Sequence, residues 1–224
     1  MQSISLEVYR RLFKAWGPQH WWPADSPFEV MVGAVLVQNT NWKNVERAIQ
    51  NLKSAGALVP HKLLGIPLEE LQELIRPAGY FRVKAQRLRS LVSFFVDEFN
   101  GEISAMQATS HDELRQRLLS VHGIGPETAD SILLYAVGKP ALVVDAYTQR
   151  LFARHGWIPH GSSYQALKGH IEGELPVDAT IYNEFHALIV QLGKIYCRRT
   201  PLCDGCPLQQ LLPEGGVILE KCAC

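Results

Sequence analysis

Residues 118–130 read LLSVHGIGPETAD and place two glycines around a single apolar residue, between two stretches of helical periodicity. A helix does not continue cheaply through Gly-Ile-Gly-Pro, because glycine carries an entropy cost and proline lacks a backbone N–H. Proline is favoured at the first position of a new helix. The stretch therefore predicts a helix over 111–120, a tight hairpin, and a second helix over 126–137.

Such a hairpin turns backbone N–H groups and a helix N-terminus outward, where they can bind a phosphate oxygen. A lone Gly-x-Gly more often marks a simple helix–helix turn with a glycine cap. The continuation favours phosphate binding, because the apolar run 141–144 leads directly into Asp145 and a further helical pattern. By composition alone, Asp145 is more simply the N-cap of that helix.

The segments GIGPETADSILLYA (123–136) and VVDAYTQRLFARHG (143–156) resemble the helix-hairpin-helix and the Gly/Pro-Asp loop of the endonuclease III family of DNA glycosylases. The resemblance implies that the hairpin binds the DNA backbone and that Asp145 is the essential acid. The hairpin residues implied to contact DNA are Gly123, Ile124, Gly125 and Thr128.

The composition indicates a globular protein without a membrane segment. At 224 residues the chain can bury a sizeable core, and its hydrophobic content of 47% argues against disorder. No apolar run approaches the roughly 20 residues that span a bilayer. The N-terminus lacks a signal pattern, so we expect a cytoplasmic protein.

The charge balance is unusual for a protein that binds nucleic acid. The net charge is zero, whereas such proteins tend to be basic. DNA binding would therefore require charge to gather on one face. The local concentration of Arg82, Lys84, Arg87 and Arg89 is interpreted as the solvated face of a helix.

Apolar spacing and caps predict the first two helices of the chain. Residues 4–16 have the pattern of an amphipathic helix. Ser26-Pro27-Phe28-Glu29 supplies an N-cap, a proline at the first position and a glutamate at the third. The helix 28–37 that follows is almost entirely apolar, so it should be central and buried.

A polar segment, Gln38-Asn39-Thr40, ends that apolar helix. In the endonuclease III family a similar helix ends in a segment that carries a DNA-inserting glutamine, so the resemblance implies this role for Gln38. Alternatively, Asn39 or Thr40 caps the next helix, 41–54, which does not exclude insertion by Gln38.

Tyr80 lies in a glycine-aromatic-aromatic segment ahead of a lysine-containing helix that runs to Phe99. In the family pattern, a residue of the matching loop wedges into the gap that a flipped base leaves in the DNA. The resemblance therefore implies that Tyr80 contacts DNA.

All five cysteines follow residue 196, which indicates metal binding rather than disulfides in a cytosolic chain. Four thiolates at these spacings can hold zinc or a 4Fe–4S cluster. The segment PLCDGCP (201–207) resembles the iron–sulfur loop of endonuclease III, although the first spacing is one residue shorter and the fourth cysteine is much further away. We expect a 4Fe–4S cluster, with zinc as the second choice. The expected ligands are Cys197, Cys203, Cys206 and Cys222, with Cys224 as the alternative fourth ligand.

Glu127 departs from the strand-cleaving members of the family, which carry a lysine here that forms a Schiff base with the sugar. A carboxylate cannot do this, so we predict base removal without lyase activity. Asp145 would stabilise the oxocarbenium-like sugar or orient the attacking water, with Glu127 near the active site. The enzyme needs to supply the least stabilisation of the transition state for an alkylated purine, because the positive charge of this base makes it a good leaving group.

Electron-rich rings suit a cationic base through stacking and cation–π attraction. The chain resembles the 3-methyladenine DNA glycosylase branch of the endonuclease III superfamily, in which aromatic residues near Trp21 and Trp42 sandwich the base. The implied substrate contacts are Trp21, Trp22, Pro23 and Trp42; without this context both adjacent tryptophans would be interpreted as packing residues. The matching segments are WWP (21–23), FE (28–29), GAVL (33–36), QNT (38–40), RPxG (76–79), KAxRL (84–88), GIGxE (123–127) and VVD (143–145).

We expect an all-α fold with two helical lobes and an active-site cleft between them. Residues 26–138 would form the lobe that contains the helix-hairpin-helix at 111–138. Residues 1–25 and 139–224 would form the other lobe, with a cysteine loop at 197–224.

The predicted function is that of a monomeric, monofunctional DNA glycosylase in base excision repair. It would flip alkylated purines such as 3-methyladenine out of double-stranded DNA and hydrolyse their N-glycosidic bond. One alternative is a glycosylase for oxidised pyrimidines. Another is a non-catalytic helix-hairpin-helix module that binds DNA, and the weakest is a cysteine-metal protein unrelated to DNA.

Overall fold

The computed structural model describes residues 3–219, and within this range all regular structure is helical, as predicted. No helix in the described range is both long and apolar enough to cross a membrane. The elements are α1 (Ile4–Trp16), α2 (Pro27–Leu36), α3 (Trp42–Ser54), α4 (Pro60–Gly65), α5 (Leu68–Leu74), η1 (Arg76–Ala78), α6 (Phe81–Phe99), α7 (Ile103–Ala108), α8 (His111–Ser120), α9 (Pro126–Ser131), η2 (Ile132–Val137), α10 (Ala146–Arg154), α11 (Tyr164–Glu172), α12 (Ala179–Ile195) and η3 (Gln209–Leu211).

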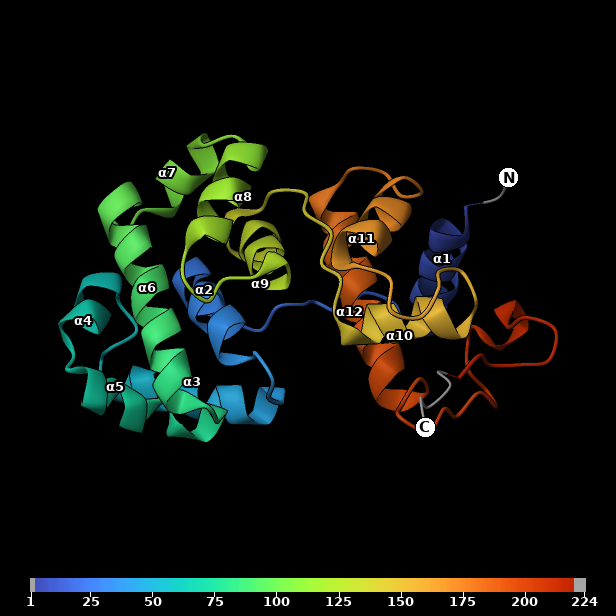
Figure 1. The fold of residues 1–224 in the computed structure, drawn as a ribbon, viewed down its shortest axis with the longest axis horizontal. Helices are drawn as coiled ribbons and strands as arrows, with labels where there is room; N and C mark the ends of the chain where they lie inside the picture. Colours follow the sequence, from blue (N-terminus) through green and yellow to red (C-terminus); the bar gives the residue numbers. More distant parts are fainter. Residues whose placement is uncertain (1–2, 220–224) are drawn as a thin grey trace. The chain divides into compact units, whose positions relative to one another are not determined.

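The chain divides into two compact units, each with its own hydrophobic core. One unit comprises Trp22–Lys139, and the other comprises Met1–Trp21 with Pro140–Cys224. The first unit holds the helices from α2 to η2, and the second holds α1, α10, α11, α12 and η3 (Figure 1).

Helix α2 forms the centre of the Trp22–Lys139 unit, where α3, α6 and η2 pack against it (Figure 1). The side chain of Ser26 accepts a hydrogen bond from the N–H of Glu29, and Pro27 occupies the first position, as the sequence predicted. Every residue from Phe28 to Leu36 is buried. Each large apolar side chain buried in this way contributes about 1.5–3 kcal/mol, so α2 anchors the unit.

The cap of α3 differs from the sequence interpretation. The side chain of Asn41 accepts the N–H of Asn44 at 3.1 Å, so Asn41 is the N-cap and the assignment to Asn39 or Thr40 was wrong. Asn39 instead has a φ of +53°. Asparagine tolerates this left-handed conformation better than most residues, so the chain uses Asn39 to turn between α2 and α3.

The helix predicted over 126–137 changes character halfway. Its first half, α9, is α-helical, and its second half, η2, is a π-helical turn. π-helical turns are rare and frequently occur at functional sites, because the extra residue per turn shifts the side chains that follow. In this chain the turn carries Tyr135.

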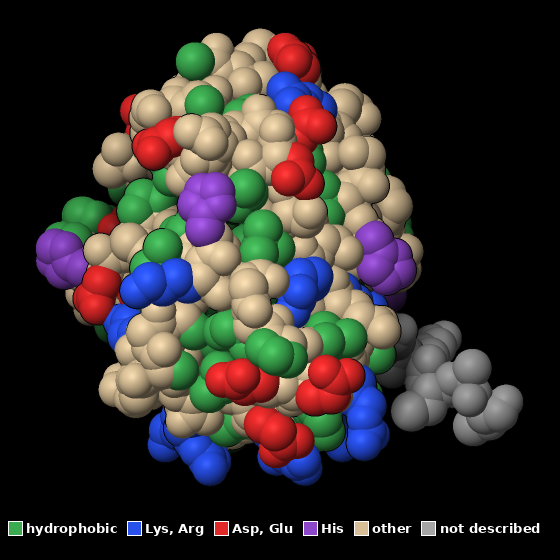
Figure 2. All heavy atoms as spheres, turned by 90° about the vertical axis from the view of Figure 1, so that its left-hand side faces the viewer, with side chains coloured by type: hydrophobic (Ala, Val, Ile, Leu, Met, Phe, Trp, Pro, Cys, Tyr) green, Lys and Arg blue, Asp and Glu red, His purple; other side chains and the backbone are tan. Residues whose placement is uncertain are grey.

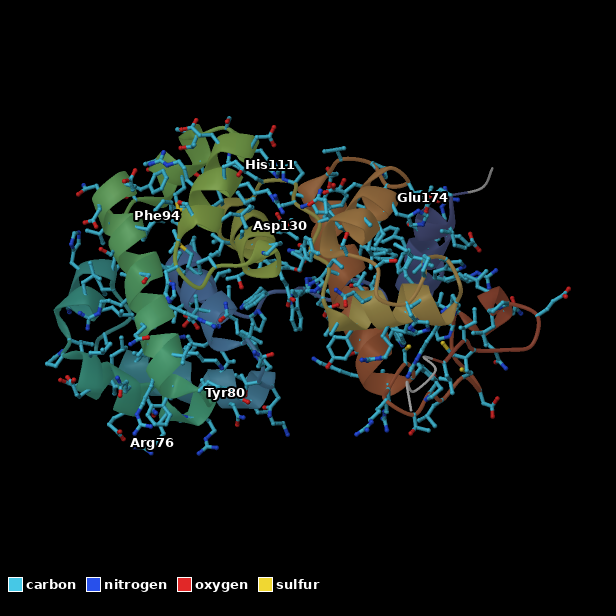
Figure 3. All side chains as sticks on the ribbon, in the orientation of Figure 1. Arg76, Tyr80, Phe94, His111, Asp130 and Glu174 are labelled. Atoms are coloured by element: carbon cyan, nitrogen blue, oxygen red, sulfur yellow. The ribbon has the colours of Figure 1, made fainter. Side chains whose placement is uncertain are left out.

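In the second unit, α1 and α10 pack against α12. Glu174, which follows α11, accepts hydrogen bonds at the start of α1 from the N–H of Ser5 at 2.8 Å and from its hydroxyl at 2.6 Å (Figure 3). Helix α10 lies very close to α12, since a Cβ on Gly193 would come within 2.1 Å of the Tyr147 ring. Only glycine permits this approach, which fixes the start of α10.

Candidate active site

The hairpin between α8 and α9 is closed by its own backbone. The N–H of Ile124 donates to the carbonyl of Val121 at 3.1 Å, and Gly123 has a φ of +84°. Gly125 is the N-cap residue of α9, is exposed, and has open space around the position of a Cβ. A phosphate group can therefore approach the backbone closely at Gly125.

A buried ion pair joins the two helices of the hairpin motif. The guanidinium of Arg115 on α8 donates to the carboxylate of Asp130 on α9 at 2.7 and 3.2 Å, and the Asp130 side chain is fully buried (Figure 3). The charges satisfy each other where water is excluded. The pair therefore sets the angle at which the hairpin is presented.

Gln38 forms hydrogen bonds to the hairpin. Its amide nitrogen donates to the carbonyl of Gly123 at 3.2 Å and to the hydroxyl of Thr128 at 3.0 Å, and its amide oxygen accepts from Arg87 at 2.6 Å. The stem of Arg87 also fills the space next to Gly123, where a Cβ would lie 2.2 Å from Cγ. Gln38 and Arg87 thus stabilise the conformation of the hairpin.

The basic run on α6 is not the solvated face that the sequence indicated. Lys84 is 2% exposed and donates to the carbonyls of Leu36 and Ala78 at 2.8 and 2.7 Å. Arg89 donates to the carbonyls of Leu64 and Ile66. These cations satisfy carbonyls at the ends of helices. The solvated-face interpretation was therefore wrong for Lys84, Arg87 and Arg89, and of the four cations Arg82 alone is exposed.

Asp145 is the N-cap of α10, and capping uses only one of its oxygens. Oδ1 accepts from the N–H of Thr148 at 2.8 Å and from its hydroxyl at 2.9 Å. Oδ2 lies 3.6 Å from Nε2 of His186 on α12. Capping and a chemical role are therefore compatible, because the second oxygen is not committed to the helix.

The environment favours the ionised form of Asp145. Burial is the largest single effect and acts to raise the pKa of the carboxyl. The interaction with His186, together with the two hydrogen bonds from Thr148, outweighs it, so the pKa lies below its ordinary value. A carboxylate in this position is a fixed negative charge at neutral pH.

Three aromatic rings gather around α2 in the Trp22–Lys139 unit. The ring centroids of Trp22 and Trp42 are 5.0 Å apart and nearly perpendicular, and those of Trp22 and Tyr135 are 5.1 Å apart. A Cβ on Gly33 would lie 3.5 Å from Trp22 and 3.6 Å from Trp42. The absence of a side chain at Gly33 thus lets both indoles approach the helix. We call Trp22, Trp42 and Tyr135 the aromatic cluster.

The remaining predicted substrate contacts differ in their surroundings. Pro23 is exposed beside Trp22. Trp21 belongs to the other unit, where the Lys194 ammonium lies 5.2 Å from its ring centroid. Glu127 is exposed in the first turn of α9.

Tyr80 has the features expected of a residue that contacts a partner. It is 72% exposed and has a φ of +46°. A left-handed tyrosine is uncommon and costs on the order of 1–3 kcal/mol. Figure 3 shows Tyr80 at the start of α6.

Three of the predicted metal ligands, Cys197, Cys203 and Cys206, line one cavity. Burial raises the pKa of the Cys203 and Cys206 thiols, with Cys197 contributing in the same direction. Arg154 lies 3.5 Å from the Cys197 sulfur. Among residues 3–219, no three potential ligands are close enough to hold a metal ion as they stand. Cys222 and Cys224 fall outside the described residues.

Sequence reasoning missed His186, and it missed the contacts of Arg87 and Tyr135. His186 and Arg87 contact partners more than forty residues away, so the local sequence does not indicate these contacts. The position of Tyr135 depends on the π-helical turn. For His186 and Tyr135, the only sequence signal was a polar group within an otherwise apolar stretch of helix.

Comparison with known proteins agrees with the resemblance that the motifs indicated. Residues 32–176 match the HhH-GPD superfamily of base excision DNA repair proteins. The chain is 48% identical over 206 residues to MJ1434 of Methanocaldococcus jannaschii, a candidate DNA repair glycosylase, covering 91% of this chain and 93% of that protein. It is 28% identical to endonuclease III of Thermotoga maritima, covering 91% and 89%.

Two solved structures share the fold over most of the chain. A non-covalent endonuclease III–DNA complex has a TM-score of 0.81 at 26% identity and covers 94% of both chains. The 3-methyladenine DNA glycosylase MagIII of H. pylori, bound to 1,N6-ethenoadenine, has a TM-score of 0.74 at 30% identity and covers 85% of this chain and 97% of that one.

Proposed function

We propose a substrate and a mechanism for this chain, which belongs to the HhH-GPD superfamily of base excision DNA repair proteins and is a DNA glycosylase. Its substrates are alkylated purines such as 3-methyladenine in double-stranded DNA. The observation that carries this proposal is the aromatic cluster around Gly33. Its indole and phenol faces suit a flat cationic base, and the MagIII relative in the solved structure holds a modified adenine.

Base release in this proposal depends on Asp145. After the nucleotide is flipped, the base leaves with the electrons of the N-glycosidic bond and an oxocarbenium-like sugar forms. The Asp145 carboxylate stabilises this cation until water adds at C1′ and releases a proton to solvent. The lowered pKa of Asp145 keeps the carboxylate ionised for this step.

Glu127 makes the enzyme monofunctional in this proposal. It occupies the first turn of α9, where a strand-cleaving relative would need an amine. A carboxylate forms no Schiff base with the sugar. We therefore propose that the DNA strand stays intact after the base is removed, and that Glu127 contributes only charge near the reaction.

In this proposal the hairpin, Gln38 and Tyr80 contact the DNA. The hairpin that Gly123 and Ile124 shape, backed by Thr128, binds a phosphate at the exposed backbone of Gly125. The exposed ring of Tyr80 enters the DNA double helix at the flipped nucleotide. Gln38 enters there too, exchanging its hydrogen bonds to the hairpin and Arg87 for contacts with DNA. We propose that a single copy of the chain performs all these contacts, as a monomer.

The cysteine loop is proposed to hold a 4Fe–4S cluster, with zinc as the second choice. Three cysteine thiols around one cavity, with Arg154 nearby to balance thiolate charge, fit a thiolate-bound cluster. Cys197, Cys203, Cys206 and Cys222 would be the ligands. The cluster would supply structural cross-linking of the C-terminal loop rather than chemistry on the base.

Asparagine in place of Asp145 tests the mechanism. Asp145→Asn keeps an oxygen that can cap α10 but removes the charge, so DNA binding should remain within about threefold of wild type while base release falls at least a hundredfold. Gel-shift and single-turnover base-release assays measure the two quantities. Unchanged base release in the variant would contradict the role of Asp145.

Endonuclease III-like removal of oxidised pyrimidines is the second candidate function. Endonuclease III is among the relatives and among the solved structures with the same fold. The function would then require a lyase nucleophile other than residue 127. Strand breaks at thymine glycol without alkali would favour it.

A further inference from the structure

The two oxygens of Asp145 are held by different parts of the chain. Thr148, on the same helix, binds Oδ1 with its N–H and its hydroxyl. Across the helix pair, Nε2 of His186 lies 3.6 Å from Oδ2. The His186 side chain is only 7% exposed and that of Asp145 12%. The carboxylate therefore presents a small accessible face while both of its oxygens have a protein neighbour.

The position of His186 is fixed by the packing of α10 on α12. Gly193 lies about two helical turns after His186 and admits the Tyr147 ring, which would lie 2.1 Å from a Cβ. Tyr147 is two residues after Asp145 in the chain. The contact of Tyr147 with Gly193 thus holds the start of α10 against α12. This packing places Asp145 next to His186.

Capping alone leaves the Asp145 carboxylate free to pivot about the oxygen that Thr148 holds. A second contact at Oδ2 fixes the plane of the carboxylate. A polar imidazole N–H 3.6 Å from an anionic oxygen also favours the ionised form electrostatically. Precise placement matters here, because a fixed charge stabilises a cation only where that cation develops.

We propose that His186 is the positioning residue for Asp145, holding Oδ2 so that the carboxylate faces the sugar during base release. The proposal rests on the role that the proposed function gives to Asp145. His186 acts through Asp145 and touches neither base nor sugar. Its loss should therefore slow the chemical step without weakening DNA binding.

Leucine and glutamine at position 186 separate positioning from packing. His186→Leu keeps an apolar side chain but no donor, and should lower the single-turnover rate of base release roughly ten- to hundredfold. His186→Gln keeps an N–H donor and should recover much of that rate. Both variants should bind lesion DNA within about threefold of wild type.

A double variant shows whether His186 works through Asp145. In an Asp145→Asn background, His186→Leu should have no further effect on the residual rate, because groups that act as a unit are not additive. If His186→Leu lowers the rate by the same factor in wild type and in Asp145→Asn, the proposal is overturned. A wild-type rate in His186→Leu, or a loss of DNA binding that matches the loss of rate, would also overturn it.

A measurement without substrate keeps this inference distinct from the proposed function. In the DNA-free protein, NMR of the His186 imidazole nitrogens should show a proton on Nε2, and its resonance should move in Asp145→Asn. An unmoved resonance would overturn the contact itself. If instead wild type releases no base while the resonance moves, the proposed function fails and the contact stands.

Discussion

Lys84 illustrates how a single charged side chain can hold separate elements together. Its amine is buried and donates to the final carbonyls of α2 and η1, at Leu36 and Ala78. Burial, with a smaller contribution from the charge of Arg87, lowers its pKa to about 8. A neutral amine still has two N–H donors, so both contacts survive deprotonation.

Stability should depend on pH through Lys84. Its folded pKa of about 8 is below the ordinary 10.5, so the unfolded chain binds more protons between these values. The free energy of unfolding should therefore rise with pH across this window. Below about pH 8 it is lowered by the full cost of burying the charged amine. Urea unfolding of wild type and Lys84→Met, compared at several pH values, isolates this contribution.

The exposed Lys62 provides the control, since Lys62→Met should change neither the stability nor its pH dependence. Lys84→Met should also be less stable than wild type at every pH, because two carbonyls lose their donor. A pH dependence identical in wild type and Lys84→Met would contradict the account.

Residues with local signatures were the ones that the sequence predicted well. Ser26 and Asp145 each precede a helical run and accept its N–H groups, which local order is enough to indicate. Lys84 could not be predicted in the same way. Its partners at Leu36 and Ala78 meet it only after the unit has folded, so in the sequence it looked like one cation in a solvated run.

At the scale of elements, the hairpin depends on two glycines for different reasons. Gly123 has a φ of +84° and faces the stem of Arg87, whereas Gly125 has a φ of −91° and open space beside it. Any Cβ at 123 must strain the backbone and displace Arg87. A Cβ at 125 would be tolerated by the protein but would stand where we propose that a phosphate approaches.

Alanine at each position should therefore give opposite signatures. Gly123→Ala should destabilise the protein by roughly 1–3 kcal/mol and weaken DNA binding as the hairpin shifts. Gly125→Ala should leave stability within about 0.5 kcal/mol and weaken DNA binding severalfold. Thermal unfolding and fluorescence anisotropy measure the two effects. Equal stability in both variants would contradict the structural difference between the two glycines.

The cysteine loop yields a prediction about metal removal. Wild type should carry about four iron and four sulfide ions per chain. Cys206→Ser should lose them and lower the thermal midpoint. Cys222→Ser should do the same, while the matched variant Cys224→Ser keeps the cluster. Zinc in place of iron would make zinc the metal, and a metal-free protein of unchanged stability would contradict any structural site.

Long helices were predictable from periodicity, and their interruptions were not. The bounds of α1 and α8 and the end of α6 were predicted from apolar spacing. The π-helical turn η2 breaks no pattern in the sequence, because its residues are apolar in either geometry. Helices α4 and α7, of six residues each, are too short for periodicity to reveal.

At the scale of the whole molecule, the charge balance limits how DNA is held. The net charge is zero, and on the face shown in Figure 2 acidic and basic side chains are interspersed. Several of the cations on α6 are committed to carbonyls or to Gln38. The backbone N–H groups of the hairpin, rather than many lysines and arginines, are therefore expected to contact phosphates.

A weak dependence of DNA affinity on salt should result. Each phosphate neutralised by a cation contributes about −0.9 to the slope of log K against log salt concentration, so we expect a slope no steeper than about −4. Anisotropy titrations of a lesion duplex between about 50 and 200 mM salt measure it. A slope near −8 would indicate an extensive basic face that the account does not contain.

The all-α class and the superfamily could be predicted from the sequence because both depend on short, ordered motifs. Pairs that meet only in the folded chain, such as Asp145 with His186 or Trp22 with Tyr135, could not. The choice between alkylated purines and oxidised pyrimidines rests on the aromatic cluster and Glu127.

Release of free base from two duplexes distinguishes the two substrate classes. One duplex carries 3-methyladenine and the other thymine glycol, and each is analysed with and without alkali. We predict that free 3-methyladenine appears and that strand breaks follow only after alkali. Strand breaks at thymine glycol without alkali, with 3-methyladenine untouched, would contradict both the proposed substrate and the meaning assigned to Glu127.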